Sequence, residues 1–147
     1  MYKAAMSEQQ GGTRLVARAT GKVQLADARY RASLRAGHHD LIADEPEGGG
    51  GQDAGPSPFG YVLAGLAACT TITLRMYAER KAWPLTAVSV ELEYFRDNAA
   101  FRIERVLHLE GALDAEQRAR MADIAERTPV TLALKTGTTI NTKLADG

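Results

Sequence analysis

The feature that most limits how this chain can fold is one long apolar stretch near its middle, residues 61–78. Ser57 and Pro58 precede it and suit a helix start, because serine can cap free amides and proline lacks the amide that would stay unbonded there. Pro84 ends the pattern after about Lys81. The stretch also contains four polar residues, Thr70, Thr71, Thr73 and Arg75. It is therefore too polar for a membrane span and predicts a buried central helix.

Three short stretches with strand character precede this helix. Residues 13–20 are compatible with a strand, and residues 28–36 alternate apolar and polar side chains with the period of a half-buried strand. Gly37 ends the second stretch, and residues 39–43 form the third. The segment 44–56 is too rich in glycine and proline for regular structure. We expect it to be a mobile loop rather than a phosphate cradle, because no Gly-Lys-Ser/Thr follows it.

The chain after the helix predicts a hairpin. Apolar residues alternate with polar ones over residues 88–94 and again over 101–109, and Asp97-Asn98 supplies the turn between them. Arg105 is the exception on the apolar face of the return strand.

Two helices and a last strand are predicted beyond the hairpin. Asp114 begins a helix, and Gln117 three residues later completes a capping-box pattern. A short helix restarts at Thr128-Pro129, and residues 138–144 can close as a final strand. The order of strands, buried helix, hairpin, helices and strand is that of an α+β domain.

The composition indicates one globular domain. With 147 residues, we expect a flexible tail at 1–12 and a single domain at 13–147. Lys plus Arg equals Asp plus Glu, at 18 each, so nothing suggests a nucleic-acid or membrane partner. The first ten residues contain no apolar run, and one cysteine excludes a disulfide within the chain. We therefore expect a reduced, cytoplasmic setting.

That cysteine, Cys69, lies on the predicted central helix. Its neighbours at helical spacing are almost wholly apolar, namely Val62, Gly65, Leu66, Ile72, Thr73 and Met76. Inert packing is one interpretation, because free cysteines often serve as small buried hydrophobes. Reactivity is the other, but Cys69 lies about 16 Å beyond Pro58, where the dipole of its own helix has no effect. A reactive thiolate here needs a cation or hydrogen-bond donor from elsewhere in the fold.

Several segments carry a resemblance to a known family. Residues 55–70 combine a proline-opened helix, a run of small residues and then Cys69, and this pattern resembles the OsmC/Ohr signature. Residues 73–81 and the upstream segment 37–46 resemble the OsmC-like branch, and residues 127–134 are similar to the family's second signature. The resemblance covers most of the chain from about residue 13.

The resemblance implies an intertwined homodimer whose antiparallel sheets surround buried central helices, with two active sites at the interface. It also implies reduction of a hydroperoxide, often an organic one. In this chemistry a first cysteine becomes a sulfenic acid and a resolving cysteine converts it to a disulfide. An arginine and a glutamate normally hold the first cysteine as thiolate.

This chain departs from that pattern in three places. The resolving cysteine falls on Thr128, which has no redox chemistry and which we interpret as the N-cap of its helix. Phe59 and Gly60 stand where relatives carry the glutamate. The candidates for the activating cation are Arg18 and Lys22, with Arg29 as a further possibility.

No cofactor or metal is expected. His38, His39 and His108 could be grouped with Cys69 as a zinc set, but adjacent histidines in a strand point to opposite faces. No Cys-x-x-Cys or His-x-x-x-His spacing supports such a set. A Cys-His pair for acyl transfer stays open, and it would need a histidine distant in sequence.

Three hypotheses follow. The first is a peroxidase-type oxidoreductase that reduces hydrophobic hydroperoxides with Cys69 as its sole reactive cysteine and an external thiol as reductant. The second is a non-catalytic dimeric protein that keeps the fold and binds a small apolar ligand or partner. The third is a redox sensor in which oxidation of Cys69 alters a partner contact.

Overall fold

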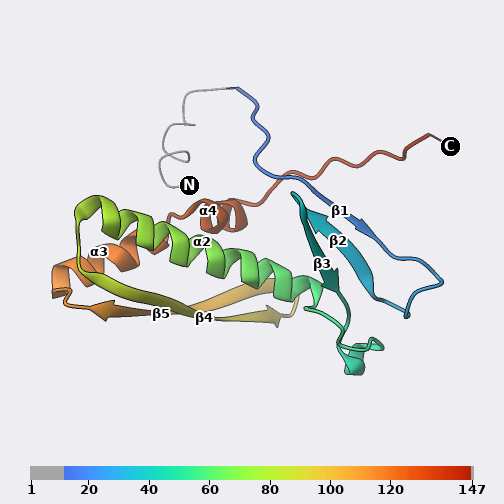
Figure 1. Ribbon diagram of the computed structural model, residues 1–147, viewed down its shortest axis with the longest axis horizontal. Coiled ribbons are helices and arrows are strands. Elements are labelled where there is room, and N and C mark those ends of the chain that lie inside the picture. Colours follow the sequence, from blue (N-terminus) through green and yellow to red (C-terminus); the bar gives the residue numbers. More distant parts are fainter. Residues whose placement is uncertain (1–11, 147) are drawn as a thin grey trace. The chain divides into compact units, whose positions relative to one another are not determined.

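The computed structural model describes residues 12–146, so the flexible tail predicted for 1–12 lies almost entirely outside the described residues. Figure 1 shows the element order, in which strands β1 to β3 precede the long helix α2, a hairpin of β4 and β5, and helices α3 and α4. The chain divides into two compact units. The sheet unit comprises residues 12–65 and 93–104, and the helical unit comprises residues 66–92 and 105–146. The prediction of a single domain stays a prediction.

The sheet unit contains a three-stranded antiparallel sheet in the order β1-β2-β3. Its strands are β1 (Ala19–Lys22), β2 (Ala32–Ala36) and β3 (His39–Ala43). The turn before β3 contains Gly37 with a positive φ of 59°, which suits a residue without a side chain. The third predicted strand is confirmed, and the second is shorter than predicted. The first lies later in the chain than predicted and shares only Ala19 and Thr20 with the stretch 13–20. The alternation of apolar and polar residues at 28–36 predicted too long a strand. The chain turns before β2, so Tyr30 is not paired with a neighbouring strand.

The loop between β3 and α2 is organised around the buried carboxylate of Asp44. Its Oδ1 accepts from the Glu45 amide at 2.8 Å, and its Oδ2 accepts from the Gln52 and Ala54 amides at 3.2 and 3.1 Å. A short 3-10 turn, η2 (Glu47–Gly49), lies within this loop. A carboxylate of the chain itself thus accepts the hydrogen bonds of three amides in this loop. That the segment is mobile and holds no phosphate stays a prediction.

Asp44 links the stability of this loop to pH. Hydrogen bonds from backbone amides, Ala54 first, hold the pKa of Asp44 below its usual value of 3.8. A lowered pKa in the folded state stabilises the fold above the unfolded-state pKa, and this contribution disappears as pH falls through the folded-state pKa. We expect Asp44→Asn to lower the melting temperature at pH 7, with a difference from wild type that shrinks below pH 4. Asp40→Asn, at an exposed position of β3, is the control; an equal effect from both would contradict this role.

Helix α2 (Pro58–Lys81) begins and ends as the sequence predicted. Ser57 Oγ accepts a hydrogen bond from the Gly60 amide at 3.1 Å, which confirms the predicted cap. By length and composition this helix could cross a membrane, with a mean hydropathy of 1.3 over its most apolar window. The core helix of a globular protein meets the same criterion, and Leu74 and Tyr77 of α2 are buried in the core of the helical unit.

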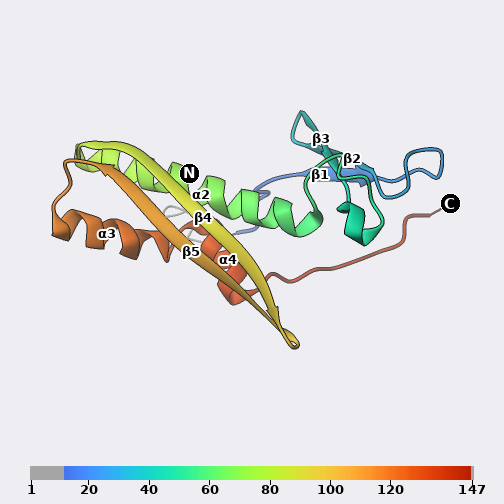
Figure 2. The same ribbon diagram turned by 90° about the horizontal axis from the view of Figure 1, so that it is seen from below.

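Strands β4 (Leu85–Asp97) and β5 (Ala100–Gly111) form the predicted hairpin and lie side by side in both views (Figures 1 and 2). Asn98, in its turn, has a positive φ of 58°, a conformation that asparagine tolerates well. At the other end, a side chain on Gly111 would meet the Pro84 carbonyl oxygen at 2.1 Å, so only glycine fits the close approach of these two segments.

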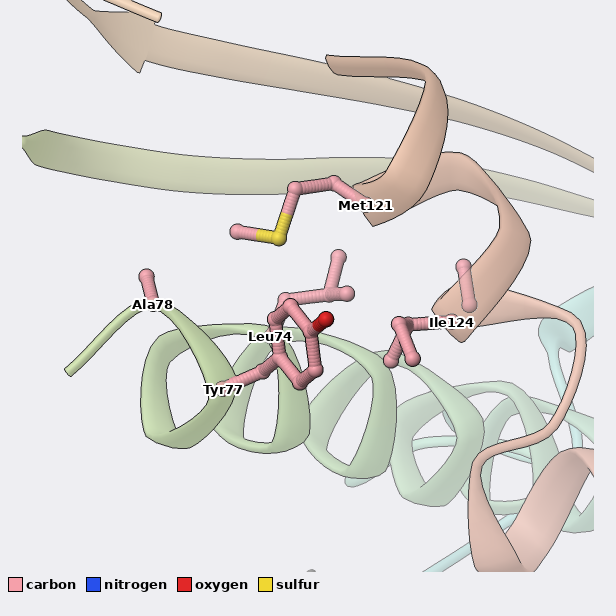
Figure 3. Close-up of a cluster of buried hydrophobic side chains, with 6 residues drawn as sticks. Leu74, Tyr77, Ala78, Met121 and Ile124 are labelled. Atoms are coloured by element: carbon pink, nitrogen blue, oxygen red, sulfur yellow. The ribbon is translucent and has the colours of Figure 1, made fainter. Parts of the chain in front are cut away.

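The core of the helical unit lies between helices α2 and α3 (Ala115–Ala125) and the hairpin. Figure 3 shows Leu74 pointing from α2 toward Met121 and Ile124 of α3. Partly buried apolar side chains from the hairpin and the segment before it complete the cluster, namely Trp83, Leu85, Val88, Leu107 and Leu109. The predicted apolar faces of both strands are therefore confirmed in this unit.

The C-terminal helices follow the predicted start signals. The Asp114 side chain accepts from the Gln117 amide at 2.7 Å and the Gln117 side chain accepts from the Asp114 amide at 2.9 Å, so the predicted capping box is present. Helix α4 (Pro129–Thr136) starts after Thr128 as predicted. The strand predicted for 138–144 is wrong: these residues are irregular, because no strand of the described chain pairs with them.

Candidate functional site

Cys69 is buried in the helical unit, with 3% of its surface exposed. It comes from the middle of α2, and its sulfur faces the first turn of α4. The backbone amide of Val130 donates a hydrogen bond to Cys69 Sγ at 3.5 Å, and the hydroxyl of Thr73 lies 3.9 Å from the same sulfur. The donor that the sequence required from elsewhere in the fold is therefore a backbone amide 61 residues away.

The Val130 amide has this role because of its place in α4. It belongs to the second residue of the helix, after Pro129, and amides in the first turn have no acceptor within their own helix. Such amides carry the positive end of the helix dipole, so they stabilise negative charge placed against them. The first turn of α4 therefore presents one of these amides to the Cys69 sulfur.

The interpretation of Thr128 as a capping side chain is wrong. Thr128 occupies the N-cap position, but its side chain makes no capping hydrogen bond. Its hydroxyl instead lies 2.6 Å from the hydroxyl of Thr131, and both residues are buried. Because the Thr128 hydroxyl bonds Thr131, it does not accept from the Val130 amide, which donates to the Cys69 sulfur instead.

A buried arginine lies beside this contact. Arg105 Nη1 donates to the hydroxyl of Thr70 at 3.1 Å and to the hydroxyl of Thr131 at 3.0 Å. Its Nη2 donates to the Ala125 carbonyl oxygen, the last residue of α3, at 2.9 Å. The Arg105 side chain is 12% exposed, and a carboxylate oxygen of Glu126 lies 3.7 Å away.

Glu126 supplies the countercharge near this guanidinium. Its other oxygen accepts from the Lys135 ammonium at 2.5 Å. Lys135 first, and Arg105 to a smaller extent, hold the pKa of Glu126 below its usual value of 4.5, so it is ionised at neutral pH. The Arg105 guanidinium thus donates hydrogen bonds to three oxygens, and the Glu126 carboxylate supplies the opposite charge. A buried charge is costly unless it is hydrogen-bonded and paired in this way.

The remaining candidates from the sequence lie in the sheet unit. Lys22 ends β1 and Arg18 immediately precedes it, and both are exposed. Their role as activating cations stays a prediction. Phe59, at the position of the family's glutamate, packs its ring against Tyr94 at 5.0 Å and Phe101 at 5.7 Å, so an aromatic cluster occupies the start of α2.

Sequence reasoning missed Val130 and Arg105. Val130 carries no signal of its own, because its contribution is a backbone amide. Arg105 did carry a signal, since it interrupts the apolar face of a strand whose other inward residues pack in the core. Among residues 12–146, no group of three or more histidine, cysteine, aspartate or glutamate side chains is placed to hold a metal ion.

Comparison with known proteins identifies the family. The model of the OsmC family, described as OsmC-like protein, matches residues 49–143, well over half of the chain. The chain belongs to the OsmC family. The matched segment includes Cys69 and both signatures recognised in the sequence. No curated protein matches the sequence.

Solved structures of OsmC proteins share the fold. An OsmC-like protein from Mycoplasma pneumoniae superposes with a TM-score of 0.70 at 16% identity, over 84% of this chain and 89% of that one. The organic hydroperoxide resistance protein OsmC from Legionella pneumophila gives 0.63 at 20% identity, over 84% and 92%. The organic hydroperoxide resistance protein OhrB of Bacillus subtilis gives 0.56 at 21% identity, over 82% and 91%. The predicted α+β fold, with antiparallel sheets and a central helix, is confirmed.

Proposed function

We propose that this OsmC protein reduces organic hydroperoxides through Cys69 and an external thiol. Two of the similar structures are named as organic hydroperoxide resistance proteins. The observation that carries the proposal is the hydrogen bond from the Val130 amide to Cys69 Sγ at the start of α4. A cysteine that only filled space in the core would need no such donor, whereas a nucleophilic thiolate does.

The chemistry proceeds in two stages. The thiolate of Cys69 attacks the O–O bond, takes the hydroxyl oxygen as a sulfenic acid and releases the alkoxide, which leaves as an alcohol after protonation. The sulfur loses two electrons and the peroxide gains them. An external thiol then displaces water from the sulfenic acid to form a mixed disulfide, and a second thiol releases reduced Cys69 and a small-molecule disulfide.

The proposal includes an assembly and a setting. We assign the protein to a homodimer, as the OsmC resemblance implies. Apolar residues on the described surface are consistent with a partner chain, and among them are Ile72 at 41% and Leu132 at 45% exposure. A catalytic thiol with no second cysteine in the chain depends on small thiols, and these are abundant in the reducing cytoplasm, where we place the reaction.

The test is to expose the full-length protein to cumene hydroperoxide at neutral pH and trap the sulfenic acid with a carbon nucleophile. We expect the label on the tryptic peptide 36–75, which contains Cys69, and one alcohol formed per sulfur oxidised. With a dithiol present, turnover should be continuous. Cys69→Ser should abolish labelling and turnover, and Thr71→Val is the matched control, because the Thr71 hydroxyl bonds the Ala67 and Ala68 carbonyls of its own helix.

A binding function is the second candidate, and two observations favour it. Only 3% of Cys69 is exposed, and the helical unit has a groove of about 460 Å³ beside α2 that is partly lined by Ile72, Trp83 and Val88. Absence of any trapped sulfenic acid after prolonged exposure to peroxide would exclude the peroxidase and leave this function. Labelling without turnover would instead indicate the redox sensor.

A further inference from the structure

We propose that Arg105 is a positioning residue for the Cys69 site, an inference that rests on the proposed function. Its guanidinium joins the two helices whose contact defines the site. Thr70 follows Cys69 in α2, and Thr131 follows Val130 in α4. One nitrogen of Arg105 donates to both threonine hydroxyls, at 3.1 and 3.0 Å, so it fixes the distance between the two backbones next to the sulfur.

The second nitrogen fixes the direction of approach. Arg105 Nη2 donates a hydrogen bond to the Ala125 carbonyl at the end of α3, four residues before α4 begins at Pro129. This bond holds the segment that leads into α4. A guanidinium is planar and presents its donors in a rigid fork, so three acceptors bonded to it lie in a fixed geometry. The amide of Val130 depends on that geometry to reach the sulfur.

The location of the charge argues against a purely structural role. Arg105 lies on the inward face of β5, at a position where the alternation of the strand calls for an apolar residue. Its neighbours on this face, Leu107 and Leu109, pack in the core. A well-packed apolar side chain at such a place is often as stable as a buried ion. The arginine has instead three hydrogen bonds that all end on helices α2, α3 and α4 around Cys69.

The test uses Arg105→Met, Arg105→Lys and a control, Arg118→Met. Arg118 also donates to three backbone carbonyls of the helical unit, at 3.1 to 3.3 Å, but none belongs to α2 or α4. We expect Arg105→Met to slow sulfenic acid formation at Cys69 by about tenfold or more, as loss of alignment does in other sites. Arg105→Lys should recover part of the rate, because an ammonium keeps the charge without the fork, and Arg118→Met should react like wild type.

A second readout needs no reaction at all. The amide proton of Val130 should move upfield in the nuclear magnetic resonance spectrum of Arg105→Met as its hydrogen bond to sulfur is lost, and stay in place in Arg118→Met. If Arg105→Met does not fold, Thr70→Val removes the acceptor of Arg105 in α2, a hydroxyl whose other bond goes to the Leu66 carbonyl of the same helix, and should give the same shift. An unchanged Val130 resonance in the folded variants would overturn the proposal. If wild type forms no sulfenic acid while the resonance moves, the proposed function fails and the positioning role stands.

Discussion

Leu74→Ala is expected to remove about 2–5 kcal/mol from the free energy of unfolding. Leu74 is completely buried in the helical unit, where it packs against Met121 and Ile124 of α3 (Figure 3). Truncation removes the transfer free energy of the lost methyl groups and leaves a cavity that these neighbours cannot fill. Since a domain of this kind is stable by about 5–15 kcal/mol, the loss is a large fraction of the total.

The measurement is urea unfolding followed by the fluorescence of Trp83, the single tryptophan, which packs against the same cluster. Arg75→Ala is the matched control on the adjacent residue of α2. Arg75 forms only an exposed ion pair with Glu79, so its loss should change stability by less than about 0.5 kcal/mol. Similar effects from the two variants would mean that the α2–α3 contact is not part of the cooperative core.

The local elements could be predicted because their signals are local. Ser57-Pro58 and the Asp114–Gln117 pair satisfy free amides within one helical turn, and the period of two in the hairpin needs only neighbouring side chains. The final strand at 138–144 failed for the opposite reason. A strand needs a partner for its backbone groups, and alternation along one segment does not provide one.

The site was less predictable than the fold. The family resemblance gave Cys69, and it placed the second cysteine of relatives at Thr128, the N-cap residue of the helix that contacts the sulfur. The contact between Cys69 and Val130 joins residues 61 positions apart, and no spacing rule relates them. Threonine generally favours N-cap positions, but this preference gave the wrong interpretation of the Thr128 side chain. Its hydroxyl bonds the Thr131 hydroxyl and not a backbone amide of the helix.

The second large effect is expected when a second cysteine is introduced at position 128. We expect Thr128→Cys to convert the oxidised protein to an intramolecular disulfide between residues 69 and 128. Thr128 is 1% exposed and lies two residues before the amide that contacts Cys69 Sγ. Cysteine is close to threonine in size, so the buried position accepts it with little repacking.

The chemistry explains why the effect should be nearly complete. A sulfenic acid condenses with a nearby thiol, with loss of water, faster than a dilute external thiol can reach a buried sulfur. After one equivalent of cumene hydroperoxide, the variant should lose two hydrogens in mass, and its tryptic peptides 36–75 and 128–135 should be joined. Thr128→Ser, which matches cysteine in shape and has no thiol, should retain a trappable sulfenic acid. If Thr128→Cys retained a trappable sulfenic acid too, the side chain at position 128 would not reach Cys69 in a geometry that allows a disulfide. An external thiol would then be needed even with a second cysteine at this position.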